Sequence, residues 1–340
     1  MTRDAPARPG PRRALVVGWS SVVHGEATAG DVLSMRAVEA ALLAAGVQVD
    51  LAWSPVMATA PGAGGVELLL ADPDDYTDLV WACGPLHGCP VAEVAARFAG
   101  LRRTAVGVSV VDDDDEGLGA WDLVLPRDAP GRPGVRDLAA GPAAALARDL
   151  AAAAAPPTPS SGPAGTGVLG VYLAPGQAEY GERRRHDAVT EALGERLAAS
   201  PHARLALDTR LDPRGWRDPS TPAEVLALLR RCDAVVTMRL HGLVLALAAG
   251  VPAVAVDPVA GGGKVSAQAA AWGWPAVVGA EQLLGGAAAG SALGSVDDPL
   301  GAQLGWALGE LGRAAALQAA REAPAAGREQ LEALVAAVLA

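Results

Sequence analysis

The sequence predicts an α/β fold with two domains, each built on a mainly parallel sheet, that face each other across a cleft. Three observations lead to this prediction. Short apolar runs of strand length alternate with helix-like segments in both halves of the chain, which is typical of parallel sheets. A segment rich in proline and glycine, residues 151–167, separates the halves as a linker. The length of 340 residues suits two domains of ordinary size.

The first half, residues 13–150, is predicted to be the N-terminal α/β domain. Its longest helical segment runs from Asp31 to Gly46, where the glycine is suited to end a helix, and a second helix is expected at residues 91–103. Residues 1–12 are expected to be a disordered tail, because the apolar run after them is too short for a secretory signal. Strands are predicted at residues 14–19, 47–53, 78–84, 104–111 and 122–126.

The second half, residues 168–340, is predicted to be the C-terminal α/β domain with the same alternation. Parallel sheets bind ligands beyond the carboxyl ends of their strands, so a cleft between two such sheets is the expected binding site. Strands are predicted at residues 168–174, 203–208, 234–238 and 252–256, and helices at residues 181–199, 222–231 and 241–249.

Composition excludes several classes of protein. The formal net charge is -11 at pH 7, and no basic block with interleaved aromatic residues occurs, so we expect no nucleic-acid partner. The cysteines Cys83, Cys89 and Cys232 have neither CxxC nor metal-ligand spacing, so we expect reduced, mostly structural thiols, a cytoplasmic protein and no required metal. The longest apolar run, from Gly242, is shorter than the ~18 residues of a membrane span, so no transmembrane segment is expected.

A turn with two polar side chains follows one of the predicted buried strands. In the stretch TMRLHGLVLALAAGVPAVAVDP, Arg239, Leu240 and His241 stand between that strand and a helix. The free backbone N–H groups at the start of a helix attract an anion, and Arg239 adds a forked donor suited to carboxylate or phosphate. We therefore expect an anion site at this turn. The structural alternative is that Arg239 and His241 only cap the strand end by hydrogen-bonding to the backbone.

A second cation follows the next strand in the same way. That strand ends at Asp257, and Lys264 stands at the start of another predicted helix. If the two strands are neighbours in the sheet, Lys264 lies beside Arg239 and His241. Lys264 is the only lysine in the chain, which suggests that a compact ammonium matters at this position. The alternative is a solvated loop lysine with no particular role.

These residues resemble the polysaccharide pyruvyl transferase family. The segments MRLHGLVLALAAGVPAVAVDP and GGGKVSAQAAAWGWP match the family's RLH motif, its A-x-x-x-G-V-P helix end and its downstream lysine. GWSSVVHGEATAGDVLSMRAVEAAL resembles the family's first loop, G-N-x-G-D, with Gly30 and Asp31 retained and the asparagine replaced. LPRDAPGRPGVRDL resembles its R-D-x-x-S segment, but the serine expected after Arg127 and Asp128 is not in place.

The resemblance implies two Rossmann-like domains in a GT-B-like arrangement, with the donor in the C-terminal domain and the acceptor in the N-terminal domain. It also implies a reaction, the transfer of a pyruvyl group from phosphoenolpyruvate to a sugar of a surface polysaccharide or its precursor, as a ketal. Phosphoenolpyruvate is then the donor substrate, and no cofactor is expected. The oligomeric state is left open.

The resemblance assigns phosphoenolpyruvate binding to Arg239, Leu240, His241 and Lys264. His241 is the expected general acid because imidazole titrates near neutral pH. Nearby cations are expected to lower its pKa until the trianionic substrate binds.

On the acceptor side the resemblance points to Gly30, Asp31 and His24 in the first loop. Asp31 is expected to orient or deprotonate an acceptor hydroxyl, although a Gly-Asp pair is as often a turn or a helix N-cap.

Two other function classes stay open. A GT-B-like glycosyltransferase that uses a nucleotide sugar would share this architecture and would bind a nucleoside diphosphate, but no glutamate for a ribose is obvious after the RLH helix. A non-catalytic descendant of the family would keep the fold and bind neither donor.

Overall fold

The computed structural model describes residues 12–23, 27–113, 115–153, 167–285 and 298–340. The strands of the N-terminal domain are β1 (Arg13–Val17), β2 (Gln48–Trp53), β3 (Val66–Glu67), β4 (Asp78–Ala82), β5 (Arg102–Ser109) and β6 (Leu123–Asp128). Those of the C-terminal domain are β7 (Val168–Tyr172), β8 (Ala203–Ala206), β9 (Ala234–Thr237), β10 (Ala253–Asp257) and β11 (Val277–Gly279).

The α-helices in chain order are α1 (Ala29–Ala44), α2 (Cys89–Arg97), α3 (Ala140–Ala153), α4 (His186–Ala198), α5 (Pro222–Leu229), α6 (Leu240–Ala248), α7 (Lys264–Trp272), α8 (Ala280–Gly285), α9 (Pro299–Leu308), α10 (Glu310–Glu322) and α11 (Arg328–Leu339). Short 3-10 helices are η1 (Trp19–Ser21), η2 (Met57–Thr59), η3 (Leu68–Leu70), η4 (Pro73–Asp75), η5 (Glu116–Ala120), η6 (Ala178–Arg183) and η7 (Ala323–Ala325).

Each domain is built on one parallel sheet, as predicted. The strand order is β3-β2-β1-β4-β5-β6 in the first sheet and β11-β10-β9-β7-β8 in the second, and every neighbouring pair is parallel. Central strands such as β1, with residues 14–17 fully buried, are apolar on both faces because helices cover both sides of a parallel sheet. The predicted α/β fold with two mainly parallel sheets is confirmed.

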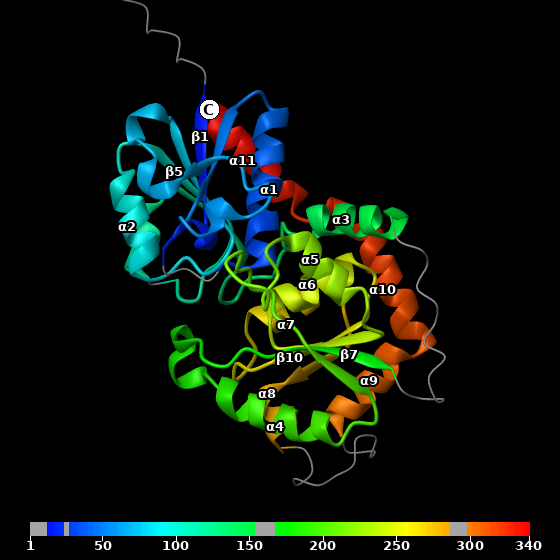
Figure 1. Ribbon diagram of the computed structural model, residues 1–340. Helices are drawn as coiled ribbons and strands as arrows, with labels where there is room; N and C mark the ends of the chain where they lie inside the picture. The colour runs from blue at the N-terminus through cyan, green and yellow to red at the C-terminus, as the bar shows by residue number, and fades with distance from the viewer. Residues whose placement is uncertain (1–11, 24–26, 114, 154–166, 286–297) are drawn as a thin grey trace, which may run out of the picture.

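The two domains share a continuous apolar core. Helices α1, α3, α5 and α6 lie between the two sheets (Figure 1), and their buried faces belong to one cluster of apolar side chains. Separate clusters lie on the outer faces, under α2 in the N-terminal domain and under α4, α8 and α9 in the C-terminal domain. The carboxyl ends of both sheets are thereby held toward each other.

The last helix returns to the first domain. Helix α11 lies beside α1 in Figure 1, and Gln330 Nε2 donates to the backbone oxygens of Leu125 and Pro126 at 3.2 and 2.8 Å. The prediction placed all of residues 168–340 in the C-terminal domain, whereas residues 328–339 pack on the N-terminal sheet. The alternation of strands and helices does not reveal which sheet a helix covers. Of the predicted linker, residues 154–166 lie outside the described part of the chain.

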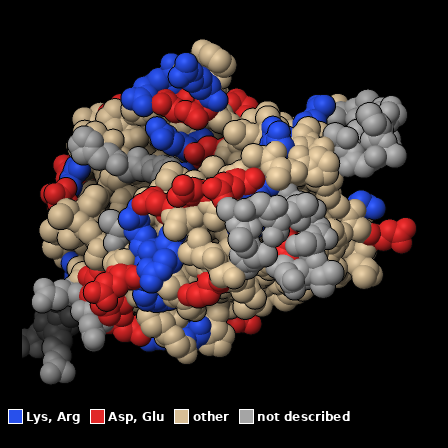
Figure 2. All heavy atoms as spheres, turned by 90° about the horizontal axis from the view of Figure 1, so that it is seen from below, with Lys and Arg blue, Asp and Glu red and all other residues tan. Residues whose placement is uncertain are grey.

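Basic and acidic side chains are mixed on one face of the molecule (Figure 2), whose net charge is negative. On the face shown in Figure 2, groups of basic side chains lie directly beside groups of acidic ones, so the described atoms of this face form no continuous basic surface for a polyanion. Within the described ranges, no helix has the length and hydropathy needed to cross a membrane.

Candidate functional site

A cavity of about 720 Å³ lies between the domains at the carboxyl ends of their strands. Strands β9 and β10 are parallel neighbours, so the turn after β9 and the loop after β10 open at the same edge of the sheet. The N-terminal wall comes from the start of α1 and from the segments after β1 and β4. The lining residues are Trp19, Thr28, Asp31, Gly84, Pro85, His87, Gly88, Arg127, Pro175, Gln177, Glu179, Thr209, Arg239, Leu240, His241 and Lys264.

The structure brings most of the predicted site residues to this cavity. All four residues assigned to phosphoenolpyruvate line it, together with Asp31 from the opposite domain. Gly30 lies directly beneath the ring of His241, because a Cβ built on Gly30 would stand 2.2 Å from the ring carbons. His24 lies outside the described residues.

Arg239 is the N-cap residue of α6 and holds the turn together. Its backbone N–H donates to Thr237 Oγ1 at 3.0 Å, and that hydroxyl donates to the backbone oxygen of Arg239 at 2.9 Å. The guanidinium donates to the backbone oxygen of Leu173 at 3.1 Å and to Asp208 Oδ2 at 3.3 Å. Arg239 therefore fixes the strand end and also presents its guanidinium at the cavity wall.

Lys264 begins α7 and is not a solvated loop lysine. Its side chain is 16% exposed, its Nζ lies 3.8 Å from Glu179 Oε1, and the ammonium sits over the ring of Tyr180. Burial lowers the pKa of Lys264, and the carboxylate of Glu179 opposes this effect. An anion bound in the cavity would replace part of the solvation that Lys264 lacks.

His241 joins the two domains through both ring nitrogens. The Thr28 hydroxyl donates to Asp31 Oδ2 at 2.6 Å, so it accepts from His241 Nδ1, which lies 3.0 Å away. On the other side, Nε2 lies 3.6 Å from Asp137 Oδ2 and 3.5 Å from Cys83 Sγ. The ring is thus placed to carry a proton on each nitrogen.

The surroundings of His241 favour its charged form. Burial works against the imidazolium, but Cys83 and the carboxylate of Asp137 outweigh burial and raise the pKa of His241. The expectation that nearby cations lower this pKa was wrong. The guanidinium of Arg239 is bonded to Asp208, whereas the carboxylate of Asp137 faces the ring itself.

A buried ion-pair network supports the ring from behind. Arg127, at the end of β6, donates from Nε to Asp128 Oδ2 at 2.9 Å and from Nη1 to Asp137. Burial would raise the pKa of Asp137, but the charge of Arg127, the hydrogen bond and charge of His241 and the backbone N–H of Ala139 together outweigh burial and lower it. Ser109 of β5 also donates to Asp128 Oδ2 at 3.0 Å, so this carboxylate joins the same network.

Three residues that contact His241 were not predicted from the sequence to belong to the site. Thr28 stands three residues before Asp31 and caps α1, a spacing that a search for helix N-caps finds. Asp137 gives no such signal, because only the packing of the chain after β6 brings it to the ring. Cys83, predicted to be a mostly structural thiol, directly follows β4 with a φ of 67° and lies against the imidazole. Burial raises the pKa of its thiol.

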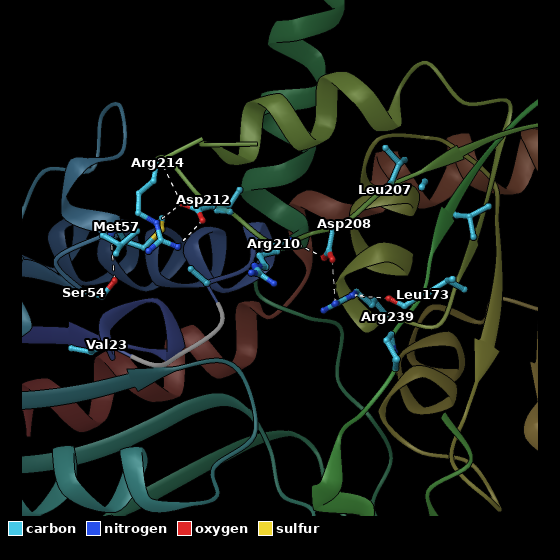
Figure 3. Close-up of a pocket in the computed structure, with 16 residues that line it drawn as sticks. Val23, Ser54, Met57, Leu173, Leu207, Asp208, Arg210, Asp212, Arg214 and Arg239 are labelled. Atoms are coloured by element: carbon cyan, nitrogen blue, oxygen red, sulfur yellow. Dashed lines mark hydrogen bonds and ion pairs between the residues drawn. The ribbon is translucent and has the colours of Figure 1, made fainter. Parts of the chain in front are cut away.

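A second cavity, of about 750 Å³, adjoins the first and shares Pro175 and Arg239 with it. Figure 3 shows Arg214 paired with Asp212 near Met57, and Arg239 with Asp208 farther along the wall. The loop after β8 links the domains here, because the backbone N–H of Ala29 donates to Thr209 O at 2.7 Å and that of Leu211 to Ala27 O at 2.8 Å. The remaining lining residues include Val23, Ser54, Val56, Val171, Leu173, Ala206, Leu207 and Arg210.

Gly30→Ala should disturb the site because the new methyl group has no room beside the imidazole of His241. We expect about 1–3 kcal/mol of destabilisation from the forced displacement. Urea unfolding checks this. A matched control is Gly194→Ala in α4, where a Cβ meets nothing within 4 Å and where alanine should stabilise the helix by up to about 1 kcal/mol. Equal effects of the two changes would contradict the close approach at Gly30.

The fold and the site define a two-domain α/β protein of the GT-B class with a polar site between its domains. Solved structures share this fold. Spinosyn rhamnosyltransferase SpnG complexed with thymidine diphosphate matches 96% of this chain and 100% of its own, with 14% identity and a TM-score of 0.52. Os79 from O. sativa in complex with UDP matches 95% of this chain and 100% of its own, with 13% identity and a TM-score of 0.50.

The family comparison singles out the segment around the RLH turn. The sequence model of the family described as polysaccharide pyruvyl transferase matches residues 201–258, which run from before β8 to the residue after β10. The predicted resemblance to this family is confirmed over that segment, and it indicates a transferase. Arg239, Leu240 and His241 fall inside the match, whereas Lys264 lies beyond it. No curated protein gives a significant match to the chain.

Proposed function

We propose that the protein transfers a pyruvyl group from phosphoenolpyruvate to two hydroxyls of a sugar in a surface polysaccharide or its precursor, forming a cyclic ketal. The observation that carries this proposal is the convergence of Arg239, His241 and Lys264 on one cavity. The family match over residues 201–258 supports the reaction class. Phosphoenolpyruvate is the donor substrate, and the reaction is proposed to take place in the cytoplasm.

Phosphoenolpyruvate carries a carboxylate and a phosphate, and the C-terminal wall of the cavity offers groups for both. The first backbone N–H groups of α6 have no acceptor within the helix, and they follow Arg239 directly. Lys264 adds an ammonium from the neighbouring strand loop. The half-buried position of these groups strengthens their attraction for an anion, although the net charge of the chain is negative.

Ketal formation needs one proton donor and one proton acceptor. The methylene carbon of phosphoenolpyruvate takes a proton, a sugar hydroxyl attacks the adjacent carbon, phosphate leaves, and a second hydroxyl closes the ring. We assign the proton donation to His241, whose charged form is favoured by Asp137 at 3.6 Å. Asp31 stands at the same wall and receives the hydroxyl proton of the acceptor, while Thr28 links Asp31 to His241 by hydrogen bonds. The protons balance because one of the two hydroxyl protons restores the proton that His241 gave to the methylene carbon, and the other leaves with the phosphate.

The second cavity is suited to the acceptor. It adjoins the first cavity at Pro175 and Arg239, so a sugar held there would lie next to the proposed donor. Its wall combines carboxylates, Asp208 and Asp212, with apolar side chains such as Met57 and Leu211. Sugars present hydroxyl groups and apolar C–H faces, and this mixture matches both.

Calorimetric titration tests the donor assignment. We expect phosphoenolpyruvate to bind the wild-type protein and Arg239→Ala to weaken binding by at least about tenfold, because a hydrogen bond to a charged group contributes about 1.5–3 kcal/mol. Arg313→Ala is the matched control, since Arg313 lies exposed on α10, away from both cavities, and donates a hydrogen bond to Leu308 O. Equal binding by both variants would place the donor elsewhere.

The same titration separates the alternatives. Two solved structures with this fold are a rhamnosyltransferase with thymidine diphosphate and a protein with UDP. If nucleoside diphosphates bind and phosphoenolpyruvate does not, a nucleotide-sugar glycosyltransferase replaces our proposal. If neither ligand binds, our proposal is replaced by the alternative that the protein is a non-catalytic descendant of the family.

A further inference from the structure

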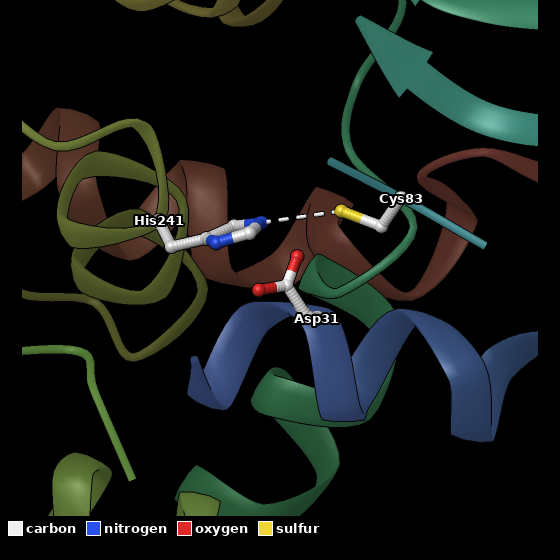
Figure 4. A group of neighbouring side chains, drawn as sticks. All are labelled: Asp31, Cys83 and His241. Atoms are coloured by element: carbon white, nitrogen blue, oxygen red, sulfur yellow. Dashed lines mark hydrogen bonds between the residues drawn. The ribbon is translucent and has the colours of Figure 1, made fainter. Parts of the chain in front are cut away.

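We propose that Asp31, Cys83 and His241 form a binding site for a thiophilic divalent cation, with Zn²⁺ as the best fit. The three side chains come from α1, from the residue after β4 and from α6, and Figure 4 shows them converging on one point. One ligand atom from each lies within 4.8 Å of those of the other two. The described side chains thus bring a carboxylate, a thiol and an imidazole together, which is a ligand set that zinc prefers.

The spacing of the sulfur and the nitrogen fits a tetrahedral ion. Cys83 Sγ lies 3.5 Å from His241 Nε2. Bonds of about 2.3 Å to sulfur and about 2.0–2.1 Å to nitrogen, set at a tetrahedral angle, separate these two atoms by about 3.5 Å. Little movement of either side chain is therefore needed to admit the ion. Asp137 Oδ2, 3.6 Å from Nε2 and 4.0 Å from Sγ, offers a further oxygen at similar spacing.

Neighbouring residues already orient His241 and stabilise Cys83 in the way that second-layer residues do in known metal sites. A histidine that binds zinc through one nitrogen donates its other N–H to a nearby acceptor, which orients the ring. Here Nδ1 donates to Thr28 Oγ1 at 3.0 Å, so Nε2 is the nitrogen left for the ion. Arg127 Nη1, 3.3 Å from Cys83 Sγ, is placed to stabilise a thiolate.

Exchange of two protons for one zinc ion leaves the net charge of the site unchanged. Zinc binding would remove the proton on Nε2 and the proton on the thiol, and one dication would take their place. The net charge of the buried group is then unchanged, with Arg127 and Asp137 still paired. The ion has a path to the site, since Asp31 and His241 both line the 720 Å³ cavity.

Occupancy would inhibit the transferase, because a zinc-bound His241 has lost the proton that we assign to the donor. This consequence rests on the proposed function, whereas the existence of the site does not. Zinc is therefore inferred as an inhibitor of the reaction and has no step in it.

Cobalt absorption tests the site without any substrate. Metal-free, full-length protein titrated with Co²⁺ should develop a near-ultraviolet band from the sulfur–cobalt bond, and Zn²⁺ should abolish it by displacement. Cys83→Ser should lose the band and weaken Zn²⁺ binding by more than about 100-fold, because even the loss of a group that only orients a ligand costs about 10–100-fold. Cys89→Ser is the matched control, since Cys89 is exposed at the start of α2 near His87.

The outcomes are distinct. A wild-type protein without the band overturns the proposal, and so does a band that Cys83→Ser retains or that Cys89→Ser alone removes. Asp31→Asn gives a second check that keeps the thiol, and we expect it to weaken Zn²⁺ binding by at least about tenfold. Phosphoenolpyruvate titrated into the same preparations reports on the transferase separately, so either proposal can fail while the other stands.

Discussion

Replacing His241 by glutamine should lower kcat for phosphate release from phosphoenolpyruvate, in the presence of acceptor, by about 10²–10⁴-fold. Glutamine keeps a hydrogen-bonding side chain at the wall but cannot deliver a proton to the methylene carbon. Phosphoenolpyruvate binding should persist, because Arg239 and Lys264 remain. Steady-state kinetics and calorimetry on the same variant separate the two effects.

The control for this experiment is His202→Gln, because His202 lies outside both cavities and accepts a hydrogen bond from the backbone of Gly167 at 3.2 Å. Its kcat should match that of the wild type. A His241→Gln variant with nearly full kcat would show that the proton comes from another group.

Replacing Asp137 by alanine should destabilise the fold by about 3–5 kcal/mol. Asp137 is 1% exposed and pairs with Arg127, which is 2% exposed, so the change leaves a buried guanidinium without one of its carboxylates. The free energy of unfolding in urea measures the loss.

The control here is Asp212→Ala, which also breaks an arginine–carboxylate pair. Arg214, its partner, is 66% exposed, and such a pair at the surface contributes about 0–1 kcal/mol. Similar losses in the two variants would contradict the role of burial, and would place the contribution of Asp137 among ordinary surface contacts.

The fold was largely predictable because its strands are apolar and its helices end at clear signals. The run before Arg239 predicted β9, and the glycine after the helix, Gly250, lies directly beyond α6 and its C-cap residue. Short edge strands were missed, since β3 with two residues and β11 with three carry no periodic pattern. The alanine-rich helices α3, α10 and α11 were missed as well, because alanine has high helix propensity but marks no buried face.

The order of the elements predicts only the part of the site that the C-terminal sheet builds, whereas Asp31 was expected from the family resemblance. Arg239, His241 and Lys264 follow neighbouring parallel strands, and that adjacency can be inferred from the order of the elements. Cys83, after β4, and Asp137, after β6, both reach His241 from the N-terminal domain. Their contacts depend on how the domains meet, which the alternation of elements does not encode. The direction of the pKa shift of His241 was missed for the same reason.

The most direct measurement of the central claim is the structure of the complex with phosphoenolpyruvate. We expect the ligand in the 720 Å³ cavity, with its phosphate and carboxylate within hydrogen-bonding distance of Arg239 and Lys264 and its methylene carbon toward His241. A cavity that takes up thymidine diphosphate or UDP but never phosphoenolpyruvate, or a donor bound away from the RLH turn, would contradict the proposed pyruvyl transfer.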